Sequence, residues 1–395
     1  MMNEHYLDNA ATTEPSEAAL AAMTEALRDW GNPSSVHSLG RAAAKRLSDC
    51  RTAAARALGL PRYSADRLIF TSCGTESNNI ALLGCARAKK RDPESPGTVL
   101  LSAGEHPSLD GPASLLEGEG FTVVRIPTAG GALDLDCLSG ALEKAKAEAS
   151  PVIFAGFMLV NNETGALYDV RSAFSLVKRA FPDAVTHCDA VQGFMKVPFT
   201  PASLGADTLT VSAHKIHAPR GAALLYLSAE TVKRKNVVAV MPGGGQEGGW
   251  RSGTENLPAI AAFAAAAAEG RRSFDEDVRK VEALRARLDE RMAALGIPEN
   301  RPQNSIPHIA SIVVPRLRSE TVLNALSGQG IYVSAGSACS AHSKKKSAAL
   351  LAFGVSPDEA DSTLRVSLSH TNEQEDVDAL ADALGEIRNT LQKKR

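Results

Sequence analysis

Seven short apolar runs alternate with amphipathic segments between residues 16 and 227. Each run is four to nine residues long and rich in Val, Ile, Leu and Phe, which is typical of buried strands. The runs cover residues 67–70, 98–102, 121–126, 151–159, 184–188, 208–212 and 221–227. Helical patterns separate most of them, for example over residues 76–90 and 170–181. Strands separated by helices predict right-handed crossovers and a mainly parallel sheet with helices on both faces.

Two helices are predicted before the first strand. Ser16 occupies an N-cap position ahead of residues 17–27, and Gly31 follows as a stop. A second helix over residues 41–58 has apolar residues at steps of three and four and meets Gly59, so one of its faces should be buried.

The pattern changes at the glycine-rich stretch 242–253, which suits neither a helix nor a central strand. A long helical pattern follows over residues 257–294. Beyond it, the sequence predicts strands at 308–314, 331–334 and 363–369, with helices around 320–326 and 373–393. We therefore expect an α/β protein with a large, mainly parallel-sheet domain over residues 15–255. A smaller α+β domain should comprise residues 1–14 and 256–395.

Composition narrows the class of protein. The 395 residues are 22% charged and 44% hydrophobic, with a formal net charge of −2, so charge gives no reason to expect a nucleic acid or an anionic membrane as partner. Six cysteines are too few for a disulfide scaffold. The N-terminus lacks a secretory pattern, and the apolar runs 259–268 and 152–160 are shorter than the roughly 18 residues of a membrane span. These features predict a cytoplasmic protein.

The first candidate for chemistry is Lys215, just after the predicted strand 208–212. Ligands of open α/β sheets bind at the carboxyl ends of the strands, and a lysine held there can form a Schiff base with an aldehyde. Asp189 ends the strand before it and should face the same edge, where an acid would keep the ring nitrogen of lysine-bound pyridoxal phosphate protonated. Gln192 could then bond the ring hydroxyl. Considered alone, each residue has an ordinary interpretation: Lys215 would be a lysine at a strand end in solvent, and Asp189 would be a helix N-cap.

A phosphate cradle is predicted at residues 71–77, which follow a strand and open a helix. Gly74 would let the backbone approach a ligand, and free N–H groups at a helix start attract phosphate. The hydroxyls of Thr75 and Ser212 and the ring of His214 could add donors. Helix capping without a ligand is the alternative.

Two further segments complete this edge. His106 follows strand 98–102, where an imidazole can stack on a planar ring and move protons. Asn161 and Asn162 follow strand 151–159 and could hold a ring hydroxyl or a substrate, or simply form a turn. Each segment is ordinary alone, but an amine, an acid, a stacking ring, a phosphate cradle and amides on one edge are much less expected by chance.

The smaller domain offers a thiol and a guanidinium. Cys339 lies in the small-residue run 334–341, which predicts a mobile, exposed loop, and the basic residues 342–346 would favour its thiolate. Arg365 lies in strand 363–369 and could clamp a carboxylate, or face water as an ordinary strand arginine. No cysteine pair has C-x-x-C spacing, so we expect no metal site.

These motifs, in this order, resemble the cysteine desulfurases of iron–sulfur cluster assembly, within the pyridoxal-phosphate-dependent class V aminotransferases. The resemblance covers nearly the whole chain and implies the fold type I of such transferases. Its motifs are residues 6–13, 31–35, 74–79, 105–106, 161–165, 189–192, 212–215, 243–247, 251–256, 336–339 and 365–367.

The resemblance implies a role for each candidate. Lys215 would bind the cofactor covalently, Asp189 would pair with its ring nitrogen, and His106 would stack on the ring. Cys339 would take sulfur from L-cysteine as a persulfide, leaving alanine, and pass it to an acceptor protein. The implied contacts are Gln192 and Asn162 at the ring hydroxyl, Gly74, Thr75, Ser212 and His214 at the phosphate, Thr254 at the phosphate of the other subunit of a homodimer, and Asn162 and Arg365 at the substrate.

Two other functions stay open at this point. A selenocysteine lyase or related pyridoxal-phosphate-dependent C–S lyase would share the cofactor residues without needing Cys339. A non-enzymatic sulfur-relay protein on a decayed enzyme fold is the second, and the complete set of candidate residues argues against it.

Overall fold

A seven-stranded sheet forms the centre of the computed structural model, which describes residues 4–90, 97–336 and 346–392. Its strand order is β2-β8-β7-β6-β5-β3-β4, and all strands run parallel except β8, which is antiparallel to both neighbours. The strands are β2 (Leu68–Thr71), β3 (Thr98–Ser102), β4 (Thr122–Ile126), β5 (Val152–Met158), β6 (Val185–Asp189), β7 (Thr208–Ser212) and β8 (Ala223–Leu227). All seven predicted strands and the mainly parallel sheet are confirmed.

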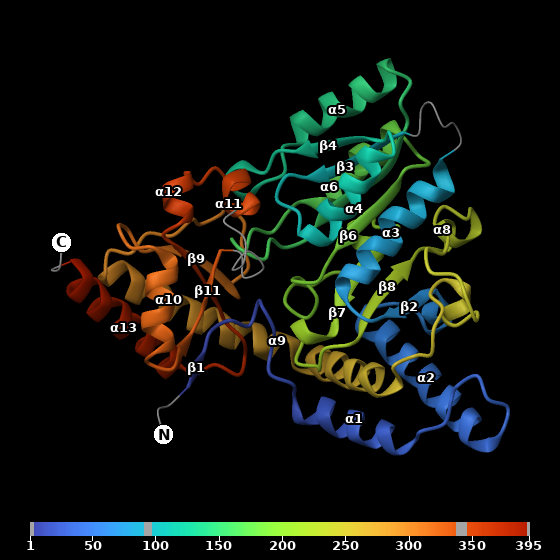
Figure 1. The fold of residues 1–395 in the computed structure, drawn as a ribbon, viewed down its shortest axis with the longest axis horizontal. Coiled ribbons are helices and arrows are strands. Elements are labelled where there is room, and N and C mark those ends of the chain that lie inside the picture. The colour runs from blue at the N-terminus through green and yellow to red at the C-terminus, as the bar shows by residue number, and fades with distance from the viewer. Residues whose placement is uncertain (1–3, 91–96, 337–345, 393–395) are drawn as a thin grey trace.

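Helices cover both faces of this sheet (Figure 1). One face packs against α3 (Gly74–Lys89) and α4 (Pro107–Gly118). The other packs against α5 (Leu135–Ala147), α6 (Val170–Ala180), α2 (Ser38–Ala57) and part of α9 (Leu257–Ala294). Because both faces are covered, every residue of the six strands other than the edge strand β4 is buried, which explains the near-continuous apolar runs in the sequence.

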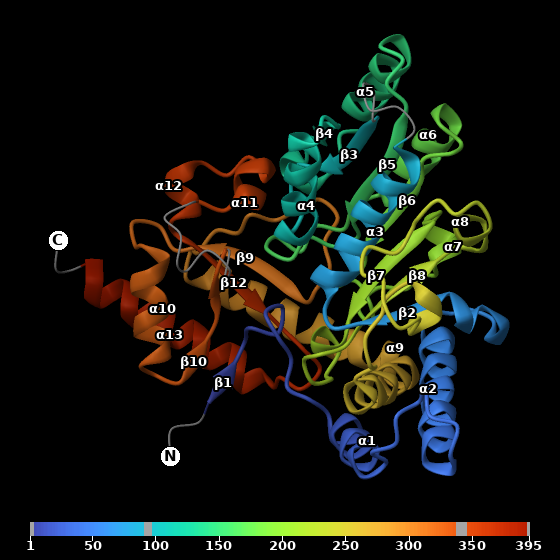
Figure 2. The same cartoon turned by 45° about the vertical axis from the view of Figure 1, so that its right-hand side comes forward.

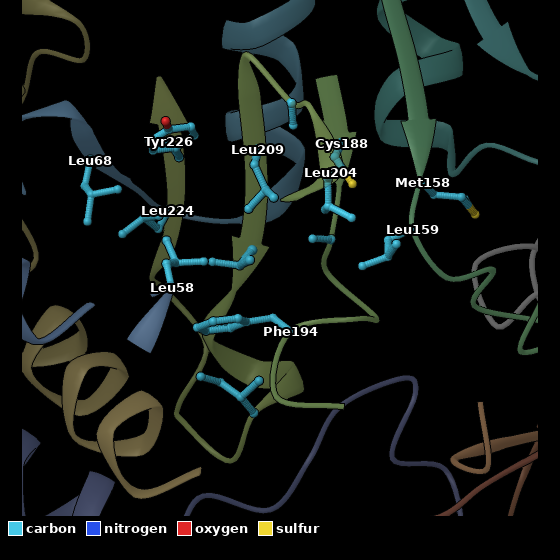
Figure 3. Packing of buried hydrophobic residues seen from close by; sticks show 14 of the residues in the cluster. Leu58, Leu68, Met158, Leu159, Cys188, Phe194, Leu204, Leu209, Leu224 and Tyr226 are labelled. Atoms are coloured by element: carbon cyan, nitrogen blue, oxygen red, sulfur yellow. The ribbon is translucent and has the colours of Figure 1, made fainter. Parts of the chain in front are cut away.

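Apolar side chains fill the space between the sheet and the helices of this second face. Figure 3 shows ten of them by name: Leu58, Leu68, Met158, Leu159, Cys188, Phe194, Leu204, Leu209, Leu224 and Tyr226. Phe194 also packs against Phe263 of α9, with ring centroids 6.4 Å apart. Burial of this surface fixes the sheet on its helices and so fixes the edge that carries the candidate residues.

A smaller sheet has the order β11-β12-β9 and is antiparallel. Its strands are β9 (Ile309–Val313), β11 (Ser334–Ala335) and β12 (Thr363–Ser367). The predicted strand 331–334 is divided, because β10 (Ile331–Tyr332) pairs in parallel with β1 (His5–Tyr6) instead. The helices of this part are α10 (Ser319–Ser327), α11 (Ala348–Phe353), α12 (Pro357–Ala360) and α13 (Gln374–Gln392).

Helix α9 is common to both parts of the molecule. The side chain of Asn256 caps it by accepting from Ala259 N at 3.3 Å, and its bounds agree with the predicted helix. Residues from Leu257 to Ala267 belong to the core of the large sheet, and residues from Val281 to Met292 belong to that of the small sheet. The proposed domain boundary near residue 255 therefore precedes a helix that contributes to both cores.

The N-terminal segment also joins the two sheets, and Figure 2 shows it running from β1 to α1 (Glu17–Arg28). Ala10 N donates to Ser367 Oγ of the small sheet at 2.8 Å, and Thr13 N donates to the His214 carbonyl after β7 at 2.9 Å. None of the helices in the described ranges is long and apolar enough to span a membrane.

Candidate active site

The candidate residues of the large domain lie where the parallel strands end. Gly74, His106, Asn162, Asp189 and Lys215 follow or end the strands β2, β3, β5, β6 and β7, respectively. The charges of Asp189 and Lys215 both affect the pKa of His106, as expected for side chains at one edge of the sheet.

Lys215 ends a short 3-10 turn, Ala213–Lys215, directly after β7. Its Nζ donates to the carbonyls of Ala10 and Ala11 at 2.6 and 2.7 Å. The N-terminal segment therefore supplies acceptors that direct the amine toward the junction of the two sheets.

Asp189 is buried at the end of β6, and donors hold both of its carboxylate oxygens. Oδ1 accepts from Val191 N at 3.0 Å, and Oδ2 accepts from Asn78 Nδ2 at 2.8 Å. A carboxylate fixed in this way keeps its charge in one orientation, as an acid facing a protonated ring nitrogen would need.

His106 is the N-cap of α4, and its Nδ1 accepts from Ser108 N at 3.1 Å. Because Nδ1 is an acceptor, the proton of the neutral ring is on Nε2. Burial lowers the pKa of His106; the Asp189 carboxylate opposes this shift, and the Lys215 charge adds to it. The ring is thus neutral at pH 7, with Nε2–H as a donor, and Nδ1 can take up a proton only when it is released from the Ser108 N–H.

Gln192 has a fixed amide orientation. Its Oε1 accepts from Lys196 Nζ at 3.0 Å, and its Nε2 donates to the Ala10 carbonyl at 2.8 Å. Burial and the charges of Lys215 and Arg365 lower the pKa of Lys196 to about 7. The second N–H of Gln192 has no partner among the described residues, and a ring hydroxyl oxygen could accept from it.

The predicted phosphate cradle lies at the start of the 16-residue helix α3. Ser212 Oγ is buried there and has no hydrogen-bond partner within the described ranges. A Cβ on Gly74 would lie 3.8 Å from Ser212 Cβ and 3.2 Å from Val191 Cγ2, so this close approach suits glycine. An orphaned hydroxyl beside a helix N-terminus fits a phosphate group.

The other predicted phosphate contacts differ in exposure. Thr75 is exposed in the first turn of α3. The His214 ring is half-buried with Nδ1 3.3 Å from Thr12 Oγ1, and burial and the neighbouring charge of Lys215 lower its pKa to about 4. Thr254 is exposed ahead of α9, where a second chain can reach it.

The glycine-rich stretch lies beside this cradle because two ion pairs hold it. Arg251 Nε donates to Glu76 Oε1 at 2.7 Å, and the other oxygen of Glu76 accepts from Ser72 N at 2.6 Å. Arg51 and Glu247 form a second, bidentate pair at 2.6 and 2.7 Å. The segment between residues 242 and 253 is thereby anchored at both α3 and α2.

Arg365 is buried in β12, and the structure gives its guanidinium two partners. Nη2 donates to Asp8 Oδ1 at 2.8 Å, and Nη1 donates to the Asn162 carbonyl at 3.1 Å. Arg365 Nε is buried and without a partner among the described residues. The reading of Arg365 as a strand arginine in water is therefore wrong, and the guanidinium lies between the two sheets.

Cys339 lies outside the described residues, but the structure describes the chain on both sides of it. Gly336 approaches Glu163 so closely that a Cβ would lie 3.0 Å from Oε2, and Ser347 Oγ donates to the same oxygen at 2.6 Å. Burial raises the pKa of Glu163 to about 7, against the lowering effects of the Ser347 hydrogen bond and the Arg365 charge.

This buried carboxyl predicts a pH-dependent effect of Glu163→Gln on stability. The pKa of about 7 in the folded protein exceeds the ordinary value of 4.5, because burial disfavours the charged carboxylate. Ionisation of Glu163 therefore lowers the free energy of unfolding not at all below pH 4.5 and by its full amount above pH 7. The penalty is about 3 kcal/mol, and the neutral amide removes it while still accepting from Ser347. In thermal unfolding, the melting temperature of Glu163→Gln should rise relative to that of the parent as the pH increases from 5 to 8.5.

The exposed Glu17→Gln is the matched control and should show no such trend. A constant difference between Glu163→Gln and the parent at both pH values would contradict the predicted buried ionisation.

Several site residues had no role assigned from the sequence. Asp8, Asn78, Ser108, Lys196 and the carbonyl of Ala10 all contact candidate residues. Asp8 and Asn78 lie within recognised motifs, but nothing in the sequence says which side chains they meet. Ser108 lies close to His106 in the sequence, and Lys196 lies close to Gln192. This proximity could have predicted the two contacts.

The chain is similar to known proteins of one family over nearly its whole length. The model of the family "Aminotransferase class-V" matches residues 5–380. The chain is 33% identical to cysteine desulfurase NifS of Azotobacter vinelandii, over 95% of the chain and 90% of the relative. It is 35% identical to a cysteine desulfurase of Cereibacter sphaeroides, over 99% of the chain and 97% of the relative. A solved NifS-like protein superposes with a TM-score of 0.88 at 30% identity, covering 98% of the chain and 100% of that protein.

Proposed function

The chain belongs to the class-V aminotransferase family and is a cysteine desulfurase, and we propose that it moves the sulfur of L-cysteine onto Cys339 with pyridoxal phosphate held on Lys215. The observation that carries this assignment is that Lys215, Asp189 and His106 all follow or end parallel strands at one edge of the sheet, beside a cradle whose buried hydroxyl has no partner among the described residues. When bound, pyridoxal phosphate supplies an electron sink for the substrate carbons.

The residues at this edge suit such a cofactor. Ser212, His214, Thr75 and the N–H groups from Gly74 onward would hold the phosphate. Asp189 would keep the ring nitrogen protonated, because donors already fix its carboxylate toward the site. Gln192 has one N–H left for the ring hydroxyl, and we place the side chain of Asn162 on the same side.

Arg365 would bind the carboxylate of L-cysteine. Its present partner Asp8 shows that the guanidinium already accommodates a carboxylate at 2.8 Å, and the unpartnered Nε adds a further donor. The substrate would share this guanidinium with Asp8 or displace it. The Asn162 carbonyl holds the other end of Arg365 in place meanwhile.

We propose that His106 moves protons between the substrate and the site. Its lowered pKa keeps the imidazole neutral at pH 7, and its Nε2–H would be the donor toward a bound cofactor or substrate, because Nδ1 accepts from Ser108. In the transfer of sulfur, the Cys339 thiolate forms an S–S bond with the sulfur of the substrate, and the C–S bond of the substrate breaks. The electron pair of that bond stays on the carbon, which takes up a proton and leaves as alanine.

The assembly and the acceptor are also proposals. The exposed Thr254 suits a contact with the phosphate of a second subunit, so we propose a homodimer with shared sites. The persulfide would pass to an acceptor protein in the cytoplasm, such as an iron–sulfur scaffold or a tRNA-thiolation protein. A selenocysteine lyase would use the same residues for the cofactor and a carboxylate but would not need Cys339, so the role of Cys339 is what separates the two activities.

The assignment predicts that the purified protein, loaded with pyridoxal phosphate, forms alanine and sulfide in equal amounts from L-cysteine in the presence of a thiol reductant. The rates with L-cysteine and L-selenocysteine should be compared in the parent and in Cys339→Ser. A desulfurase loses the cysteine reaction in the variant, whereas a lyase that does not need Cys339 keeps its rate. No alanine from either amino acid would rule out both activities.

A further inference from the structure

We infer that Asn78 is a positioning residue that orients Asp189 and His106 together, so that the cofactor ring meets both in the right geometry. The inference rests on the proposed function, because it concerns how the chain prepares that same site. Asn78 is in α3 and is 1% exposed, and its side chain contacts residues of β6 and of the start of α4, which are far apart in the sequence.

All polar atoms of the Asn78 amide are engaged. Nδ2 donates to Asp189 Oδ2 at 2.8 Å and to Ser108 Oγ at 2.8 Å. Oδ1 lies 3.0 Å from His187 Nε2. Ser108 in turn contacts His106 Nδ1 through both its backbone N–H and its hydroxyl, at 3.1 and 2.9 Å.

The orientation of this amide follows from its neighbours. If the amide were turned over, its oxygen would face the carboxylate oxygen of Asp189, and two acceptors would meet without a proton between them. His187 is fully buried, and burial lowers its pKa to about 3, so its ring is neutral at pH 7. Because Asn78 Oδ1 only accepts, His187 Nε2 carries the proton, and Nδ1 accepts from Thr208 Oγ1 at 2.8 Å.

The series of hydrogen bonds through Thr208, His187 and Asn78 therefore begins in the core of the sheet. It ends on Asp189, the acid that would face the cofactor ring. Asn78 divides its two N–H groups between the acid and the serine that fixes the His106 tautomer. Loss of this amide would free Asp189 Oδ2 and leave Ser108 Oγ without its donor. We expect both cofactor-facing groups to lose their geometry, and misplacement by about 1 Å costs on the order of 100-fold in rate.

The test uses Asn78→Ala with the neighbouring Asn79→Ala as control. Asn79 has the same side chain on the same helix, but its Nδ2 donates to the Thr75 and Ser108 carbonyls, not to Asp189. Full-length protein freed of cofactor is titrated with pyridoxal phosphate while its visible absorption is recorded. We expect Asn78→Ala to weaken cofactor binding about 10- to 100-fold and to shift the pH at which the absorption changes. Asn79→Ala should stay within about twofold of the parent.

A double-mutant cycle with Asp189→Ala distinguishes positioning from general loss of structure. If Asn78 acts through Asp189, adding Asn78→Ala to Asp189→Ala should weaken binding much less than it does in the parent. Equal losses in both backgrounds, or no loss in the parent background, would overturn the inference.

Should Asn78→Ala fail to fold, as shown by circular dichroism, Asn78→Asp keeps the size of the side chain and places an acceptor against Asp189. It should weaken binding at least as much as Asn78→Ala, and unchanged binding would overturn the inference. These outcomes differ from failure of the proposed function, in which the parent protein itself would bind no pyridoxal phosphate.

Discussion

Replacing Lys215 by alanine should abolish the desulfurase reaction and the visible absorption of the covalently bound cofactor together. The amine is the group at this edge that the carbonyls of Ala10 and Ala11 direct into the junction. Without it, pyridoxal phosphate can still be held at its phosphate but has no covalent bond to the protein. Loss of a covalent catalytic group of this kind costs on the order of 10³-fold or more in rate.

Lys215→Arg is the matched control, because it keeps a positive charge beside the two carbonyls but forms no Schiff base at neutral pH. Both variants should be inactive and bind the cofactor reversibly. Alanine production from L-cysteine and the absorption spectrum are the measurements.

Lys196 is the amine from which the experiment has to distinguish Lys215. It is a second amine that contacts Gln192 at 3.0 Å, and its pKa is lowered to about 7 by burial and by the charges of Lys215 and Arg365. Borohydride reduction of the loaded parent protein followed by peptide mass spectrometry should therefore find the label on Lys215. A label on Lys196, or persistence of the covalent adduct in Lys215→Ala, would contradict the assignment.

The second large effect is expected at Cys339. Cys339→Ser should lower sulfide release by at least about 100-fold, because a hydroxyl at neutral pH is a far weaker nucleophile than a thiolate. The absorption of the bound cofactor should be unchanged, since the contacts that would hold the cofactor come from the edge of the large sheet.

Cys73→Ser is the control for Cys339→Ser. Cys73 is an exposed free thiol at the N-cap of α3, so reagents can reach it, and the proposed transfer path does not use it. It should keep its sulfide release. Mass spectrometry after incubation with L-cysteine should show one added sulfur atom on Cys339 in the parent, and sulfur added on Cys73 instead would move the nucleophile to the cradle.

The sequence predicted the large sheet well because its strands obey one rule, apolar throughout and flanked by helices. It did not predict that β8 runs antiparallel, because the run 221–227 looks like the parallel strands around it. The chain between β7 and β8 spans only residues 213–222, which is too short for a helical crossover. The short connection between β7 and β8 is the feature from which the antiparallel direction of β8 could have been predicted.

The candidate residues of the large domain could be placed on one edge from strand order alone. Their partners could not, because Asp8 meets Arg365 across 357 residues and Asn78 meets Asp189 across 111. Hydrogen bonds of this kind depend on how two sheets and a helix pack, and no local pattern contains that information. The same holds for Glu163, whose raised pKa arises from burial against residues on both sides of 337–345.

The pairing of β1 with β10 has a consequence for how the molecule is made. A ribosome releases His5 and Tyr6 long before Ile331 and Tyr332, and Asp8 and Ala10 also wait for Arg365 and Ser367. Until then the segment that carries the Ala10 and Ala11 carbonyls lacks its contacts with the small sheet. The contacts that join the N-terminal segment to the small sheet, and with them the complete site, can therefore form only near the end of translation.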